Sequence, residues 1–132
     1  MRRLATLCFL GLFLTAVSVA AASSPIAGIY VTTISGKPAQ LDGKWILSFA
    51  GNGGYAVAKA PKTSAILIGG RSTTAGHTLT MVDGFGPLAC TGASAKGTYS
   101  WRFSGTTLKL AKKHDTCAGR PLVLAGSWTK VG

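Results

Sequence analysis

The sequence predicts an all-β fold: an eight-stranded antiparallel up-and-down barrel held by one disulfide. Glycine is frequent, with 18 residues, and short segments of alternating apolar and polar residues recur at a steady spacing between turn signals. No long stretch places apolar residues at helical spacing. Eight short strands in about 110 residues suit a barrel or a sandwich, and closure favours the barrel because it leaves no exposed strand edge.

The sequence predicts four strands in the first half of the domain, and the fourth of them is a continuous apolar run. Residues 44–50 alternate, so that Trp45, Leu47 and Phe49 share one face. The sequence Gly51-Asn52-Gly53-Gly54 follows this strand and is a strong turn signal. The expected ranges are 28–34, 44–50, 55–60 and 65–70.

The last four predicted strands include the clearest alternation in the chain. In residues 97–104, Tyr99, Trp101 and Phe103 point inward and Arg102 points outward. The expected ranges are 78–83, 97–104, 107–111 and 121–131, the last interrupted by Gly126.

The first 22 residues have the layout of a secretory signal peptide. Arg2 and Arg3 precede an apolar core over residues 4–17, and small residues follow. The core is shorter than the roughly 20 residues of a membrane-spanning helix, so we expect cleavage rather than the alternative, a transmembrane anchor. Cleavage after Ala20 or, preferably, Ala22 leaves residues 23–132 as one secreted or periplasmic domain.

Two cysteines remain once Cys8 leaves with the signal. Cys90 and Cys117 form an even pair, which in an oxidising compartment predicts one disulfide. The alternatives are two free thiols or a metal pair, but two thiols without further ligands make a poor zinc site. The disulfide would tie the loop before residues 97–104 to the loop after residues 107–111.

The charge balance is strongly basic. The chain has 14 Lys and Arg against three acids; without Arg2 and Arg3 the net charge is +9. This favours anionic partners such as acidic lipids, cell-wall polymers, nucleic acid or acidic proteins. Only Lys112 and Lys113 are adjacent, and such scattered charge is typical of a solvated surface, so we expect no specific nucleic-acid binding.

Residues that carry chemistry are scarce. Asp42 and Asp83 each precede a glycine, which favours turn formation over catalysis. Asp115 is expected to accept hydrogen bonds from its own loop or to pair with Arg120. The histidines are expected to be exposed turn residues without a second metal ligand at a recognisable spacing: His77 and His114. We therefore expect no enzyme, no cofactor and no metal.

Several motifs carry a resemblance to a known superfamily. They are Gly28-x-Tyr30, the two cysteines around the predicted hairpin, and Trp128-x-Lys130. Over residues 28–131 the chain resembles small bacterial secreted lipocalin-like (calycin-type) domains, with Tyr in place of their first-strand Trp. The resemblance implies an eight-stranded barrel with an apolar interior, in which Lys130 packs across Tyr30, and it names no ligand.

Six aromatic residues form the candidate ligand-binding set. Core packing is the alternative role for these side chains, because an eight-stranded barrel is either filled or just wide enough for one small ligand. The set is Tyr30, Trp45, Phe49, Tyr99, Trp101 and Phe103.

The expected function is that of a secreted, non-enzymatic monomer that holds a small apolar or amphipathic ligand in its barrel. One alternative is a protein-interaction or protease-inhibitor-like barrel, in which residues 23–27 form an inserted arm. The other is a basic protein that docks on anionic envelope polymers.

Overall fold

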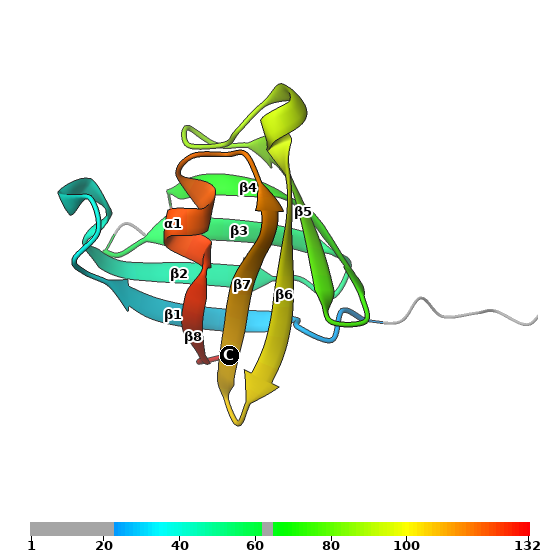
Figure 1. The fold of residues 1–132 in the computed structure, drawn as a ribbon. Coiled ribbons are helices and arrows are strands. Elements are labelled where there is room, and N and C mark those ends of the chain that lie inside the picture. The colour runs from blue at the N-terminus through cyan, green and yellow to red at the C-terminus, as the bar shows by residue number, and fades with distance from the viewer. Residues whose placement is uncertain (1–22, 62–64) are drawn as a thin grey trace, which may run out of the picture.

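Eight strands follow one another around a closed barrel, each antiparallel to the next, and the last pairs with the first (Figure 1). The structure, a computed structural model, describes residues 23–61 and 65–132, so the expected signal peptide lies outside the described residues. The predicted all-β barrel is confirmed. The strands are β1 (Gly28–Ile34), β2 (Gly43–Phe49), β3 (Gly54–Lys59), β4 (Ile66–Ala75), β5 (Thr78–Phe85), β6 (Lys96–Ser104), β7 (Thr107–Asp115) and β8 (Gly126–Lys130).

Alternation along the strands builds the core. In β2 the side chains of Trp45, Leu47 and Phe49 are buried while their neighbours are more exposed, because successive side chains point to opposite faces of a sheet. The same pattern places Tyr99 of β6 inside. The interior is packed with side chains from every strand. They include Tyr30, Trp45, Leu47, Val57, Leu79, Met81, Tyr99, Leu108 and Trp128.

The barrel closes where β1 meets β8, and this seam is short. Only Tyr30 with Lys130 and Val31 with Thr129 are registered partners. The backbone N–H of Ile29 extends the contact by donating to the carbonyl of Gly132 at 2.8 Å. The seam therefore joins the first and last strands through few hydrogen bonds.

Strand β4 is longer than the sequence predicted. We expected it to stop at Gly70, but it continues to Ala75. The two glycines allow close packing rather than ending the strand: a Cβ on Gly69 would lie 2.2 Å from the ring of Phe85, and one on Gly70 would lie 2.0 Å from the carbonyl of Val82. A register shift between β4 and β5 falls at the same place.

The last predicted strand is wrong in its first half. Residues 121–125 lie largely in a helix, α1 (Arg120–Leu124), and only then does β8 begin. Pro121 is compatible with the first helical turn because its missing N–H needs no partner there. Gly126, at φ 139°, then turns the chain into β8.

The two ends of the barrel are built differently. One end, here called the disulfide end, carries α1 and two short 3₁₀ helices, η1 (Ala39–Leu41) and η2 (Gly92–Ala95). The other, the aromatic end, carries the tight turns after β2, β4 and β6, together with residues 23–27. In Figure 1, the loop between β5 and β6, which carries η2, and the β6–β7 turn lie at opposite ends of the molecule. None of the described helices is long and apolar enough to cross a membrane.

Candidate functional site

A buried arginine organises the disulfide end. Arg120, the first residue of α1, is 1% exposed. Its Nε and one terminal nitrogen each lie 2.7 Å from a different carboxylate oxygen of Asp115 in β7. The other terminal nitrogen lies 2.9 Å from Asp83 in β5. The carbonyls of Ser94 and Ala95 accept the remaining hydrogen bonds, at 3.0 and 2.8 Å. Five oxygens thus surround a guanidinium that carries five N–H donors.

The two carboxylates are equally well paired. Asp83 also accepts a hydrogen bond from the hydroxyl of Tyr55, and Asp115 accepts one from the hydroxyl of Tyr99. Both carboxylate side chains are fully buried. We call Asp83, Asp115, Arg120, Tyr55 and Tyr99 the ion cluster. It links β3, β5, β6, β7 and α1, so it positions elements that are distant in sequence.

Burial and pairing shift the pKa values in the ion cluster. Burial raises the pKa of Tyr99, and the charge of Asp115 beside it adds to this. Burial also raises the pKa of Tyr55, and the neighbouring Asp83 raises it further. Burial alone would raise the pKa of Asp115, but hydrogen bonds from Arg120, Tyr99 and the N–H of Cys117 hold it below its usual value. Burial acts to lower the pKa of Arg120, yet pairing with both carboxylates raises it.

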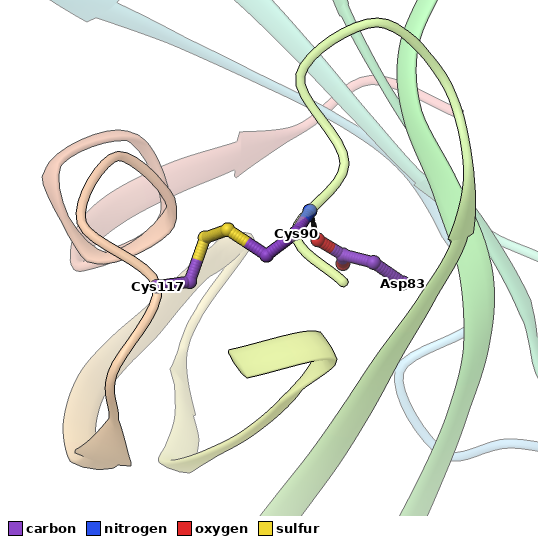
Figure 2. A group of neighbouring side chains, drawn as sticks. All are labelled: Asp83, Cys90 and Cys117. Carbon is purple, nitrogen blue, oxygen red and sulfur yellow. Dashed lines mark hydrogen bonds between the residues drawn. A yellow bond between two sulfur atoms is a disulfide. The ribbon is translucent and has the colours of Figure 1, made fainter. Parts of the chain in front are cut away.

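The disulfide is joined to the ion cluster. Cys90 and Cys117 are bonded, with Cα atoms 6.0 Å apart, so the predicted disulfide is confirmed. The backbone N–H of Cys90 donates to Asp83 at 2.8 Å, as Figure 2 shows, and that of Cys117 donates to Asp115 at 2.9 Å. Each half of the disulfide therefore binds one carboxylate of the cluster.

Asp83 and the two cysteine sulfurs lie close enough together to suggest a metal site. The residues do not fit a metal, because the sulfurs are bonded to each other and Asp83 is occupied by Tyr55, Arg120 and Cys90. The ion cluster is a closed structural unit. Neither the hollow beside residues 23–27 nor the groove on β6 and β7 is lined by Asp83, Asp115 or Arg120.

The sequence predicted the pairing of two of the five members of this cluster. Its pairing of Asp115 with Arg120 is confirmed. Its assignment of Asp83 to a turn is wrong, because Asp83 lies inside β5 and is buried. The missed signal was the alternation itself: Leu79, Met81 and Asp83 occupy every second position of the strand, so Asp83 had to point inward.

The six candidate ligand-binding residues divide into two groups. Tyr30, Trp45, Phe49 and Tyr99 are buried in the packed core. The polar atoms of three of them bind the chain itself: the hydroxyl of Tyr30 donates to Ile26 at 2.9 Å, the indole of Trp45 to Leu41 at 2.8 Å, and Tyr99 to Asp115. That these residues bind a ligand stays a prediction.

The other two candidates lie at the aromatic end. Trp101 is partly buried and Phe103 is 38% exposed, with ring centres 6.0 Å apart. Phe103 stacks on Tyr30 at 6.3 Å, and the ring of His77 lies 5.1 Å from that of Trp101. The rings of His77, Trp101, Phe103 and Tyr30 therefore form a continuous series from the surface to the core.

Residues 23–27 close the same end. Ile26 is fully buried, and the backbone N–H of Ser24 donates to the carbonyl of Gly51 at 3.1 Å. The segment borders an open hollow of about 680 Å³ against the turn at residues 51–53 and against residues 72–74 of β4. It is thus packed on the barrel rather than extended from it.

The charged side chains on the outer surface are almost all cationic. Since Asp83 and Asp115 are buried, Asp42 is the one exposed acid in residues 23–61 and 65–132. Arg120 is the one buried base over the same ranges; the others are exposed or partly exposed. They are Lys37, Lys44, Lys59, Arg71, Lys96, Arg102, Lys109, Lys112, Lys113 and Lys130.

Half of these cations lie on one hairpin. Strands β6 and β7 carry Lys96, Arg102, Lys109, Lys112 and Lys113, which we call the basic face. A groove of about 470 Å³ opens on this hairpin near the aromatic end, and Arg102 and Lys109 are among its lining residues. The prediction that Arg102 points outward agrees with its exposure.

Comparison with known proteins adds nothing to this description. No protein-family model matches the chain, and no curated protein or solved structure matches it.

Proposed function

We propose that this protein is a secreted, non-enzymatic barrel of the lipocalin-like type that docks on anionic envelope polymers through its basic face. The observation that carries the proposal is the disposition of the three acids. Two are buried and paired with Arg120, which leaves Asp42 against ten accessible cations among the described residues. A surface with one sign of charge attracts polyanions and repels other cations.

The lipocalin-like assignment has local support at the seam. Lys130 lies directly opposite Tyr30, and its side chain passes over Gly28, where a Cβ would meet the Lys130 Cε at 2.8 Å. The resemblance expects a basic residue of the last strand in this position.

The filled interior makes ligand binding inside the barrel the weaker candidate. A ligand would have to displace Trp45, Leu47 or Met81, all of which are buried in the core. The inhibitor-like arm also has little support, because Ile26 is held inside by the barrel. Docking through the surface requires neither the displacement of core side chains nor the release of Ile26.

Salt-dependent binding tests the proposal. Residues 23–132 are titrated with a soluble polyanion such as poly(glycerol phosphate) over a series of NaCl concentrations, and the dissociation constant is measured by calorimetry. We expect affinity to fall steeply with salt, because the Debye length shrinks from about 10 Å at 0.1 M to about 3 Å at 1 M. A neutral dextran of equal length is the control. Affinity that does not change with salt would overturn docking by charge.

Secretion is tested on the protein from its own host. Intact-mass measurement of the exported fraction is expected to give a chain starting at Ala21 or Ser23. A chain retained in the cell with residues 1–22 attached would contradict this part of the proposal.

A further inference from the structure

Exposed apolar side chains gather on one part of the barrel wall. Of the eight large apolar side chains that are exposed in residues 23–61 and 65–132, four belong to β4, β5 and the loop after β5. Single exposed apolar side chains are common on soluble proteins, but a group of them marks a surface that contacts something else. Val82, Phe85 and Leu88, which are 42, 56 and 51% exposed, are here called the apolar patch.

A bulge in β5 turns Phe85 outward. Met81 and Asp83 are buried, so strict alternation along the strand would point Phe85 into the core as well. The register with β4 shifts at this place, and Gly84 is the extra residue in β5. The ring of Phe85 therefore lies over Gly69, where a Cβ would be 2.2 Å from it, and remains exposed. The chain thus places an aromatic ring on its surface through a specific break in the ladder.

The loop that follows is fixed against β4. The backbone N–H of Leu88 donates to the carbonyl of Leu67 at 3.0 Å. Gly86, at φ 111°, lies so close to Leu67 that a Cβ would be 2.4 Å from the carbonyl oxygen. The loop stands out beyond the end of the barrel (Figure 1). Leu88 is therefore held at a raised and accessible position before anything binds to it.

Two cations flank the apolar patch. Val82 has Arg71 of β4 and Lys96 of β6 as its registered partners, one on each side. The next residues, Ser72 and Gly97, are buried, so both cations point to the outer face of the sheet. Both are exposed, and neither forms an ion pair within residues 23–61 and 65–132.

This combination matches the surface of an anionic lipid layer. Apolar side chains gain free energy when they enter the boundary between headgroups and acyl chains, and cations beside them are attracted to anionic headgroups. A second copy of the chain fits less well, because it would bring Arg71 and Lys96 against the same two cations. A rigid partner would also need a hollow to receive the raised loop, whereas a fluid lipid layer closes around it.

We propose that the apolar patch inserts into the surface of an anionic phospholipid membrane. Phe85 and Leu88 enter the interfacial layer, and Arg71 and Lys96 contact the phosphate headgroups. This inference goes beyond docking on polymers, which needs charge alone, because it assigns a role to apolar side chains outside the basic face.

Co-sedimentation of residues 23–132 with vesicles tests the insertion. The vesicles are phosphatidylcholine alone or an equimolar mixture with phosphatidylglycerol. The patch variant is Phe85→Ser with Leu88→Ser. The matched control, Leu122→Ser with Val131→Ser, changes exposed apolar side chains on α1 and after β8. Neither variant changes the charge, and thermal denaturation checks that both fold.

The patch variant is expected to lose at least about tenfold in its partition coefficient for the mixed vesicles, because less apolar area leaves water on binding. The control is expected to lose less than about threefold, because its side chains stay in water. The unaltered protein should bind the mixed vesicles more tightly than phosphatidylcholine alone, since only the former attract its cations.

A second variant reports insertion without weakening the patch. Phe85→Trp keeps a large aromatic ring at the exposed position, and vesicles with brominated acyl chains quench tryptophan that enters them. We expect stronger quenching than in the unaltered protein, in which Trp45 and Trp128 are buried in the barrel. Equal quenching in the two proteins would overturn insertion at Phe85, even if the patch variant fails to fold.

The other outcomes separate this inference from docking by charge. Equal losses in the patch variant and the control would overturn the patch and leave the proposed function intact. Equal binding to both kinds of vesicle would overturn the role of Arg71 and Lys96. A dimer in sedimentation velocity that the patch variant abolishes would assign the patch to a second copy instead. Patch-dependent vesicle binding without binding to poly(glycerol phosphate) would overturn the proposed function and support this inference.

Discussion

The two ends of this barrel cover the core with different kinds of side chain. At the disulfide end, buried charges are surrounded by partners from the chain: Arg120 has five oxygen neighbours, and both carboxylates are paired. At the aromatic end, rings and Ile26 cover the core, yet the N–H of Trp101 has no acceptor among residues 23–61 and 65–132, and Phe103 remains 38% exposed. The first end pairs its buried charges within the chain, whereas the second leaves aromatic ring surface exposed.

Because of this difference, we expect substitutions at the two ends to affect different properties of the protein. A buried charge is tolerated only when it is paired and fully hydrogen-bonded, so a substitution in the ion cluster should cost stability. Exposed side chains at the aromatic end have few internal partners, so substitutions there should change binding and leave folding nearly intact.

The largest effect is expected for Arg120→Met. It removes the cation that pairs with both buried carboxylates, and we expect a loss of about 3–5 kcal/mol or failure to fold. The free energy of unfolding is measured by urea denaturation. The matched control is Arg102→Met on the basic face, which should change the free energy of unfolding by no more than about 0.5 kcal/mol. Similar losses from both substitutions would remove the distinction between the two ends.

Loss of the disulfide comes next. The variant Cys90→Ser with Cys117→Ser opens a covalent loop with a sequence separation of 27 residues. The chain-entropy model gives a cost of about 3–4 kcal/mol for a loop of this length. Hydrogen exchange should accelerate first at the disulfide end, because Cys90 and Cys117 also donate to the buried carboxylates. Uniform acceleration over all eight strands would contradict this local role.

Two tyrosine hydroxyls allow a direct comparison of the ends. Tyr55→Phe removes a bond to a carboxylate, and we expect a loss of about 1.5–3 kcal/mol. Tyr30→Phe removes a bond to the neutral carbonyl of Ile26, and we expect about 0.5–1.5 kcal/mol. Urea denaturation of both variants measures the difference. The comparison fails if Tyr30→Phe proves the more damaging change.

The smallest expected effect has the opposite sign. Arg102→Gln relieves the like-charge contact with Lys109, so the ligand-free protein should gain about 0.2–1 kcal/mol. Thermal denaturation at low salt checks this, with Arg71→Gln as the control because Arg71 faces Gly54 and Val82 rather than a cation. A destabilised Arg102→Gln variant would show that Arg102 has a structural role.

The sequence predicted what depends on local pattern. Alternation in residues 44–50 and 97–104 identified the inward faces of β2 and the first part of β6, and the even pair of cysteines identified the disulfide. It missed α1 because a helix of five residues is too short to show a period, and Pro121 gave no sign of a helical turn.

The other errors arose from contacts between distant residues. Asp83 was assigned to a turn because Asp before Gly is a turn signal, but Arg120, 37 positions further on, draws it into the core. Gly69 and Gly70 resembled the end of a strand because their role, close contact with β5, depends on the packed barrel. Local pattern carries no information about such contacts.

The short seam between β1 and β8 has a consequence for the order in which the molecule folds. Val31 and Thr129, which form one of its two registered pairs, are 98 positions apart in the sequence, so their pairing closes nearly the whole chain into one loop. Local hairpins form within microseconds, but contacts with such separation are slow because the loop entropy must be overcome first. An incomplete chain that lacks β8 would therefore expose β1 as an open edge, with Ile29 already at the surface. Closure of the barrel is expected to be the last folding step, and the unpaired edge of β1 the site most prone to aggregation until it occurs.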